Sequence, residues 1–224
     1  MANSKKLLGS ISLITISYLM SRVLGFFREV LLAQWTGITS ASDTLDLAFI
    51  IPDFLFYLSA GGYLAITLIP IMSEKKKSEL NNYFLSILYG MSLIFVIFSL
   101  ITYSFRFQFA ELLGVTSLDF FVEVFTPIIF SQVFFFVGAI LMSYQYFHDN
   151  FKYAALAPVV YNSTIILFGW LNSSTPEGTI KGFATGTLVG SIIGHFLIQI
   201  YGAKKSGLNF NFTSPRYVDL KEYI

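Results

Sequence analysis

The sequence predicts an all-α membrane protein, a polytopic bundle of six transmembrane helices. Of its 224 residues 55% are hydrophobic, 18% are aromatic and only 12% are charged, and the mean hydropathy is +0.69. Soluble domains carry about 25% charged residues, so this composition is that of a chain solvated by lipid. A helix needs about twenty apolar residues to cross the hydrocarbon core. Six stretches are long enough: residues 7–35, 45–72, 83–105, 120–147, 153–171 and 182–201.

The first stretch is interpreted as a membrane span and not as a cleaved signal peptide. Lys5 and Lys6 precede its apolar run, as they would in a signal. The run nevertheless continues past Arg22 to Trp35, and no small-residue cleavage site ends it.

That span carries two arginines at membrane depth, Arg22 and Arg28. Ionisable residues at this depth are costly, and they usually face a bundle interior or a wet cavity. On a continuous helix Arg22 and Glu29 share one face, whereas Arg28 points about 120° away. Gly25 lies between the arginines, and we expect it to open or bend the helix so that both guanidinium groups reach one cavity. The pair predicts an anion site, because guanidinium forks hold phosphate oxygens bidentately.

The second span contains four residues that loosen a helix: Pro52, Gly61, Gly62 and Pro70. Proline removes a backbone hydrogen bond, and glycine is a poor helix former. Broken helices often line the substrate paths of transporters. We therefore predict that Pro52, Gly61 and Gly62 are hinge or cavity-lining positions.

An acidic stripe also marks the second span, formed by Asp43, Asp46 and Asp53. One interpretation is that these carboxylates neutralise the two arginines of the first span in buried pairs. For Asp43 and Asp46 a solvated helix start is the other interpretation, since acids suit the N-terminal end of the helix dipole.

The later spans carry weaker signals. Pro127 and Pro158 lie near span ends, where a boundary role is favoured over a hinge. His195 is interpreted as a hydrogen-bonded packing residue in preference to a proton relay. Small residues at every fourth position allow close helix packing, within one bundle in preference to a dimer interface. Five such glycines lead into the sixth span and continue along it: Gly178, Gly182, Gly186, Gly190 and Gly194.

The lysines predict the orientation. Alternate loops are rich in lysine, whereas the loops between them hold only Arg106 and Lys181. Because basic loops stay inside, we expect both termini on the cytoplasmic side of the membrane. Residues 1–203 would form the six-span lobe, and residues 204–224 a cytoplasmic interfacial tail or the approach to a seventh span. The lysine-rich set comprises Lys5, Lys6, Lys75, Lys76, Lys77, Lys152, Lys204 and Lys205.

The composition excludes several classes of function. The chain has no cysteine, which rules out a disulfide framework, a thiolate metal site and a cysteine nucleophile. The net charge of +1 and a pI near 7.8 argue against nucleic-acid binding. The sequence contains neither a phosphate-binding Gly-Lys-Ser/Thr loop nor a metal-ligand or nucleophile–base pattern. We therefore expect no enzyme activity, no metal and no cofactor.

Several motifs of the sequence resemble those of the MurJ/MviN lipid II flippases of the multidrug/oligosaccharidyl-lipid/polysaccharide exporter superfamily. The most specific block is Ser-Arg-Val-Leu-Gly-Phe at residues 21–26, followed by Arg28 and Glu29. Weaker similarity extends over the whole chain. It includes Gly37, Ala41-Ser42-Asp43, Ala48-Phe49, Ile51-Pro52, Ile69-Pro70 with Glu74, residues 137–141, and Ala157-Pro158 with Asn162.

The resemblance implies a central cavity that holds a lipid-linked pyrophosphate sugar, with substrate-binding positions at Ser21, Arg22, Arg28 and Asp43. It also implies an exporter fold of two related lobes, of which this chain resembles the first, and a place in the inner (cytoplasmic) membrane of a bacterial cell. The sequence departs from the family pattern at Phe56, where the family has an arginine, and at Gly61, where it has an acid.

The predicted function is a flippase that moves lipid II, a precursor for peptidoglycan synthesis, cell wall biogenesis and cell shape, by alternating access. One alternative is an exporter of another lipid-linked glycan or of an amphipathic drug. An alternative of a different class is a non-transporting membrane scaffold or interaction protein. The expected partners are the lipid-linked glycan, membrane lipids, and a second lobe or a further copy of this chain.

Overall fold

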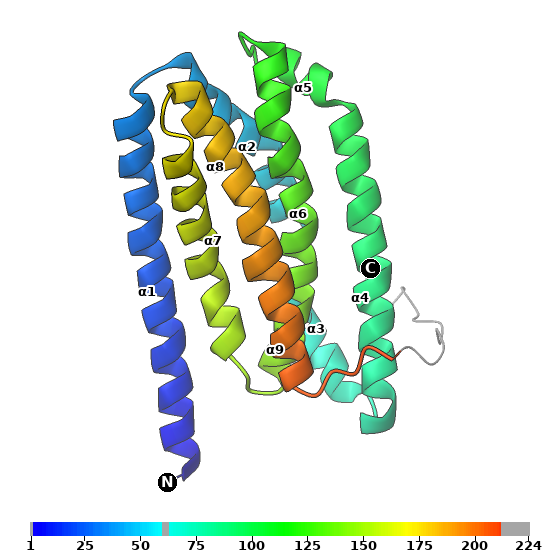
Figure 1. Cartoon of the computed structure of the whole chain (residues 1–224). Helices are drawn as coiled ribbons and strands as arrows, with labels where there is room; N and C mark the ends of the chain where they lie inside the picture. The colour runs from blue at the N-terminus through cyan, green and yellow to red at the C-terminus, as the bar shows by residue number, and fades with distance from the viewer. Residues whose placement is uncertain (1, 60–62, 212–224) are drawn as a thin grey trace.

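The computed structural model describes residues 2–59 and 63–211, and over those ranges it is built from helices without strands. A π-helical turn, Ser191–Leu197, joins α8 to α9, so that the three run as one long helix (Figure 1). The helices are α1 (Ala2–Thr36), α2 (Ser40–Ser59), α3 (Tyr63–Glu74), α4 (Lys77–Ser104), α5 (Arg106–Leu112), α6 (Leu118–Phe147), α7 (Lys152–Leu171), α8 (Pro176–Gly190) and α9 (Ile198–Lys205).

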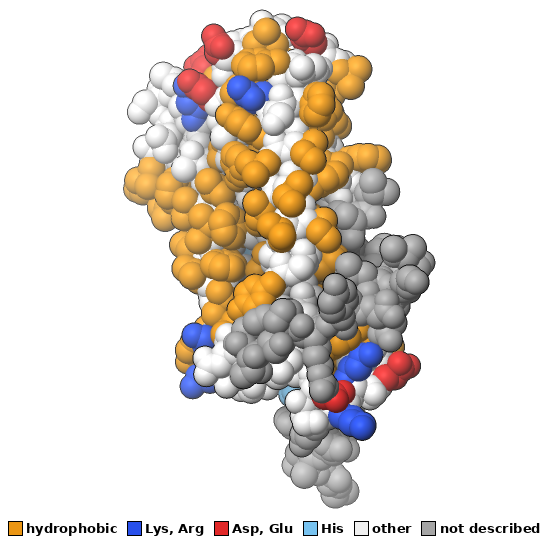
Figure 2. Space-filling view, turned by 90° about the vertical axis from the view of Figure 1, so that its right-hand side faces the viewer, with side chains coloured by type: hydrophobic (Ala, Val, Ile, Leu, Met, Phe, Trp, Pro, Cys, Tyr) orange, Lys and Arg blue, Asp and Glu red, His pale blue; other side chains and the backbone are white. Residues whose placement is uncertain are grey.

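This architecture confirms the all-α membrane bundle. Four helical stretches in the described ranges are long and apolar enough to cross a membrane: Ser78–Ser104, Leu118–Phe147, Lys152–Leu171 and Pro176–Lys205. The other two expected spans correspond to α1 and to the pair α2 and α3, so the count of six is approximate. Figure 2 shows the apolar side chains as a band between two charged ends, which is the pattern that a bilayer requires.

Helix α6 is the centre of the bundle and packs against α2, α3, α4, α5, α8 and α9. Two buried apolar clusters lie along it. One includes Phe84 of α4 and Leu141 of α6, and the other includes Leu45 of α2 and Phe125 of α6. Helix α1 contributes Leu32 to the second cluster and packs mainly against α7 (Figure 1). The core therefore joins α1, α2 and α7 to the central helix.

The glycines of the sixth span pack inside the bundle. A Cβ atom built on Gly186 would lie 2.7 Å from the Cα atom of Ile165 in α7, and one on Gly194 would lie 2.9 Å from the carbonyl oxygen of Ala157. Gly182 faces the carbonyl group of Phe168 at still closer range. The expectation of tight packing within one bundle is confirmed. Helix α7 covers this stripe in the bundle.

The prolines do not mark helix ends. Pro127 lies inside α6 and Pro158 inside α7, so the boundary interpretation is wrong for both. Pro52 and Pro70 also lie inside their helices, α2 and α3. Membrane helices tolerate proline where neighbouring groups satisfy the freed carbonyls. Gly61 and Gly62 lie outside the described residues.

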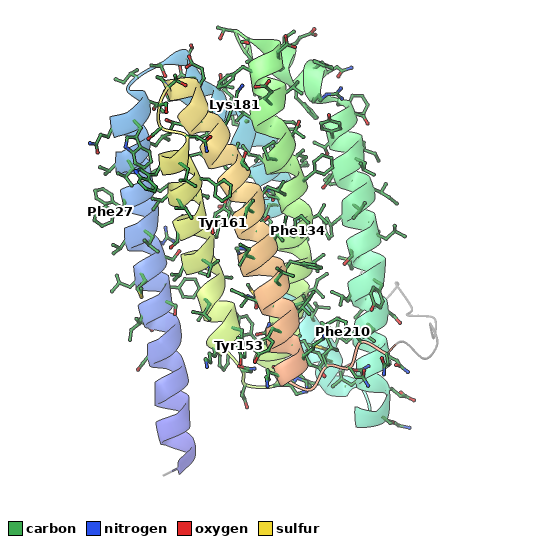
Figure 3. All side chains as sticks on the ribbon, viewed as in Figure 1. Phe27, Phe134, Tyr153, Tyr161, Lys181 and Phe210 are labelled. Atoms are coloured by element: carbon green, nitrogen blue, oxygen red, sulfur yellow. The ribbon has the colours of Figure 1, made fainter. Side chains whose placement is uncertain are left out.

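The two ends of the bundle differ in charge. The start of α4, the loop before α7 and the end of α9 lie together at the lower end in Figure 1, which gathers Lys76, Lys152 and Lys205 there. Lys181 lies near the opposite end (Figure 3). The grouping agrees with the expected loop pattern, whereas the cytoplasmic assignment stays a prediction.

Part of the expected tail packs onto the lower end of the bundle. The side chain of Asn81 donates to the carbonyl oxygen of Asn209 at 2.8 Å and accepts from its amide at 2.9 Å, and Leu208 is buried. This pairing holds the segment after α9 against the start of α4. Residues 212–224 lie outside the described ranges.

Candidate functional site

Arg28 is the central residue of the candidate site. Its side chain, on α1, is 28% exposed, and its Nε and Nη2 atoms donate to Oε1 of Glu29 at 3.0 and 2.5 Å. Its Nη1 atom donates to Oδ1 of Asn162 on α7 at 3.4 Å. The guanidinium group therefore lies between a carboxylate of its own helix and an amide of the neighbouring helix.

Asn162 joins the two helices at this level. Its Nδ2 atom donates to the carbonyl oxygen of Pro158 at 2.9 Å and to Oγ of Ser21 at 3.4 Å. Ser21 and Arg28 are seven residues apart, so they share one face of α1, and both reach the same buried amide. From the sequence, Asn162 has no predicted role beyond its place in the family resemblance. A lone amide in an apolar span was the signal for its role, since such groups hydrogen-bond across helices.

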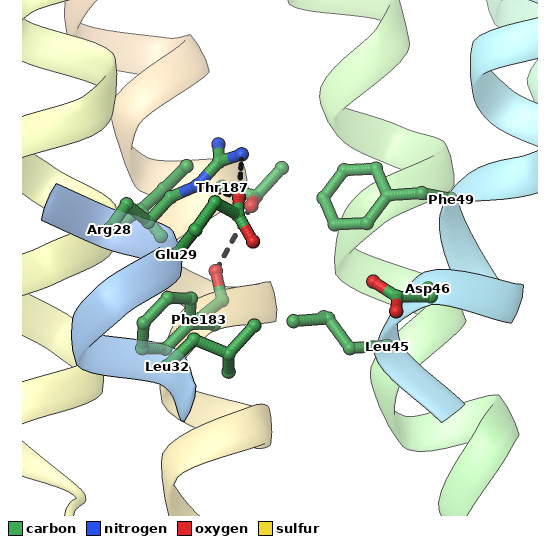
Figure 4. A pocket seen from close by; sticks show the side chains of 9 residues that line it. Arg28, Glu29, Leu32, Leu45, Asp46, Phe49, Phe183 and Thr187 are labelled. Atoms are coloured by element: carbon green, nitrogen blue, oxygen red, sulfur yellow. Dashed lines mark hydrogen bonds and ion pairs between the residues drawn. The ribbon is translucent and has the colours of Figure 1, made fainter. Parts of the chain in front are cut away.

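A cavity of about 390 Å³ opens beside Arg28. Asp46 and Asp53 of α2, seven residues apart and thus on one helix face, line it together with Phe49 and Tyr161. A smaller pocket of about 50 Å³ adjoins it. Figure 4 shows Arg28 and Glu29 on one side of this pocket and Asp46 and Phe49 on the other. The site thus presents one arginine among several carboxylates, with aromatic walls.

The acidic stripe does not neutralise Arg28 in the expected way. Within the described ranges Arg28 forms its ion pair with Glu29, and none of the three aspartates of α2 lies within 4.0 Å of an arginine. Asp46 and Asp53 line the cavity instead. Asp43 is exposed in the first turn of α2, where its amide donates to the carbonyl oxygen of Thr39 at 3.2 Å. That position agrees with a helix start.

The structure brings together two of the four predicted substrate-binding residues. Ser21 and Arg28 meet at Asn162, whereas Arg22 and Asp43 are exposed and line neither of the two cavities beside Arg28. Helix α1 runs unbroken past Gly25, so the expected opening of the helix is not seen. A polytopic bundle favours continuous helices, because lipid offers no partner for freed backbone groups. The substrate-binding roles of all four residues stay predictions.

Phe56 is the position at which the resemblance implies an arginine in the family. Its ring lies 6.0 Å from that of Phe135 and 5.6 Å from that of Phe136, centroid to centroid. In this chain the position serves aromatic packing between α2 and α6. Pro52, one turn earlier, is buried in the same helix.

Comparison with known proteins adds a second line of argument. The family model "Lipid II flippase MurJ" matches residues 32–222. The lipid II flippase MurJ of Thermosipho africanus is 31% identical over 193 residues, which are 83% of this chain and 39% of that protein. The probable lipid II flippase MurJ of Buchnera aphidicola subsp. Baizongia pistaciae is 39% identical over 112 residues, which are 49% of this chain and 21% of that protein.

A solved structure gives the same relationship. "Lipid II flippase MurJ, inward closed conformation" aligns with a TM-score of 0.72 and 29% sequence identity, covering 89% of this chain and 43% of the solved one. The chain therefore spans about two fifths of the length of these relatives. Because the family model extends over most of the sequence and the helices superpose on a member's structure, the chain belongs to the MurJ lipid II flippase family.

Proposed function

We propose that this chain is the anion-binding lobe of a flippase that moves a polyprenyl-pyrophosphate-linked peptidoglycan precursor, lipid II, across the cytoplasmic membrane. The observation that carries this proposal is the place of Arg28, at membrane depth on the wall of a cavity of about 390 Å³. A planar guanidinium group can hold two phosphate oxygens at once, and the low-dielectric surroundings strengthen that pair. The role is transport, with no bond made or broken.

The contacts of Arg28 suggest how the site changes state. Glu29 accepts from Nε and Nη2, the edge that a phosphate would take bidentately. A bound pyrophosphate must therefore displace Glu29, and the two anions define two alternative states of one arginine. Asn162 contacts the same guanidinium group and Ser21 is joined to it through Asn162, and both supply neutral hydrogen-bond donors for the remaining oxygens. Arg22 and Asp43 would join the site only after a rearrangement.

A second lobe is the proposed partner. The outer face of α1 next to the site is apolar and exposed, and the relatives are more than twice as long as the matched segment. Two lobes that rock about a central site are the usual basis of alternating access. The exposed side chains are Tyr18, Leu19, Val23, Phe26, Phe27 and Val30.

Export of an amphipathic cation is the second candidate. Asp46 and Asp53 line the same cavity as Arg28, and together with Glu29 they give the site more negative than positive charge. A cationic drug would pair with those carboxylates, whereas lipid II would pair with Arg28. A non-transporting membrane scaffold would need neither the arginine nor the carboxylates of this cavity.

The test is growth rescue in cells depleted of their own flippase. A chimaera in which this chain replaces the aligned segment of the Thermosipho africanus protein should restore growth, and the same chimaera with Arg28→Ala should not. The chain expressed by itself should not restore growth, since alternating access needs a second lobe. Equal rescue by the Arg28→Ala chimaera would overturn the phosphate role, and rescue by the chain alone would overturn the need for a partner lobe.

A further inference from the structure

A second cavity, of about 210 Å³, lies between α1, α6, α7 and the π-helical turn. Its wall carries Ser17 and Tyr18 of α1, Tyr146 of α6, Pro158 of α7 and His195 of the π-helical turn. We call it the aromatic cavity. We propose that it binds an uncharged sugar ring of the glycan, next to the pyrophosphate at Arg28; this inference rests on the proposed function.

The lining has the chemistry of a carbohydrate site. Two tyrosines, a histidine and a serine supply rings and hydrogen-bonding atoms, and none of the described residues that line the cavity is Asp, Glu, Lys or Arg. Ligand sites generally combine aromatic walls with a few placed polar groups. A pyranose offers apolar C–H faces to rings and hydroxyl groups to donors and acceptors. An anionic phospholipid headgroup would instead require a cation, so the lining favours the sugar.

One side-chain atom and one backbone atom at the cavity wall have spare hydrogen-bonding capacity. The Nδ1 atom of His195 is buried and has no hydrogen-bond partner among the described residues. Pro158 has no N–H group, so the carbonyl oxygen of Ala154, which also lines the cavity, lacks its usual helical donor. Leaving a buried polar atom unpaired costs free energy. A hydroxylated ligand in this cavity would recover part of that cost.

The position of His195 is fixed by the packing of the π-helical turn. A Cβ atom on Gly138 of α6 would collide with the backbone of His195, so only glycine allows this approach. The side-chain Nε2 atom of Gln199 donates to the carbonyl oxygen of Gly194 at 2.9 Å. It thereby helps to satisfy the altered backbone pattern of the turn. π-helical turns occur frequently at functional sites, where they re-aim a side chain.

The aromatic cavity and the Arg28 site are neighbours. The ring of His195 lies 5.7 Å from that of Tyr161, which lines the larger cavity. Along α7, Pro158 of the aromatic cavity is four residues from Asn162, a rise of about 6 Å. Along α1, Ser17 is one turn from Ser21 on the same face. These spacings suit a sugar attached to a phosphate that Arg28, Ser21 and Asn162 hold.

The experiment compares two ligands on the purified chain in lipid nanodiscs. One is the polyprenyl pyrophosphate that carries its sugar, and the other is the same polyprenyl pyrophosphate without the sugar. The ratio of their Kd values isolates the contribution of the sugar. We expect the wild-type chain to bind the sugar-bearing lipid more tightly. His195→Phe and Tyr146→Phe should each lower that preference about fivefold, the effect of one neutral hydrogen bond, and leave the Kd of the sugar-free lipid unchanged.

Matched controls come from the same chain. His148→Phe alters the only other histidine, which lies after the end of α6 and outside the aromatic cavity, and Tyr57→Phe alters an exposed tyrosine of α2. Both should keep the wild-type preference. If His195→Phe does not fold, Tyr146→Phe and the cavity-filling Ala155→Leu give the answer.

The outcomes separate the two proposals. Loss of the preference in the cavity variants, with sugar-free binding intact, supports the sugar subsite. An unchanged preference in the variants, or no preference in the wild type, overturns the subsite and leaves the Arg28 site in place. Failure of both lipids to bind the wild-type chain overturns the proposed function, and the subsite with it.

Discussion

Arg28 directs two of its nitrogen atoms, Nε and Nη2, to one carboxylate oxygen of Glu29, its neighbour in the chain. Adjacent residues on a helix do not normally face each other, so this pairing requires both side chains to turn toward a common side. The side of the guanidinium group that suits a phosphate is thus covered by an internal anion. Under the proposed function, substrate binding at this arginine would be an exchange of one anion for another.

Arg28→Lys should remove most transport in the chimaera while leaving expression intact. Lysine keeps the positive charge but has a single ammonium group, so it cannot form the bidentate contact. Lipid II export and membrane content of the protein are the measurements. Arg106→Lys is the matched control, because Arg106 begins α5 and lines neither of the two cavities beside Arg28. Wild-type export by Arg28→Lys would show that charge alone suffices.

Glu29→Gln should tighten binding of the sugar-free polyprenyl pyrophosphate. The substitution keeps the shape and a hydrogen bond but removes the negative charge that competes for Arg28. Glu29 is 56% exposed, so solvent screens the pair and the gain should be about two- to fivefold. The gain should shrink at high salt. A weaker Kd for this variant would contradict the exchange, and Glu111→Gln, on α5, serves as the control.

Gly186→Leu should destabilise the bundle without changing its oligomeric state. The new side chain would press on the backbone of α7 at Ile165, and overpacking of this kind costs about 1–3 kcal/mol. Thermal unfolding in detergent and size-exclusion chromatography measure the two effects. Gly90→Ala is the control, because a Cβ atom there meets no other atom within 4 Å. If Gly186→Leu instead dissociated an oligomer, the glycine stripe would be an interface between chains and not a contact within one bundle.

The sequence predicted the helices well because composition and length decide them in a bilayer. The helical period also predicts that Arg28 points about 120° away from Arg22, and of these two arginines Arg28 alone lines the cavities described above. The pairing with Glu29 and the bridge through Asn162 did not follow. The first depends on side-chain rotamers, and the second joins residues 134 positions apart through the packing of α1 on α7. Gly25 was expected to open its helix, whereas continuous backbone hydrogen bonding in lipid outweighs the weak helix propensity of one glycine.

The last prediction concerns orientation. The structure places the loops of the lysine-rich set at one end of the bundle and the loops of Arg106 and Lys181 at the other, so one labelling experiment decides the direction of the whole chain. The sequence has no cysteine, which makes single-cysteine variants free of background. By the positive-inside rule the lysine-rich end is cytoplasmic.

Cysteines introduced singly at Ser40, Ser117 and Ser174 should therefore react with a membrane-impermeant thiol reagent in intact cells. These three serines lie at or next to the starts of α2, α6 and α8, at the end opposite to the lysine-rich loops. A cysteine at Ser78, at the start of α4, should react only after the cells are opened. If the Ser78 variant alone were labelled in intact cells, the predicted orientation would be wrong and the lysine-rich end would face outward. It would also place the aromatic cavity, which lies toward the lysine-rich end, on the outer side of the membrane, so that a sugar would meet it after crossing instead of before.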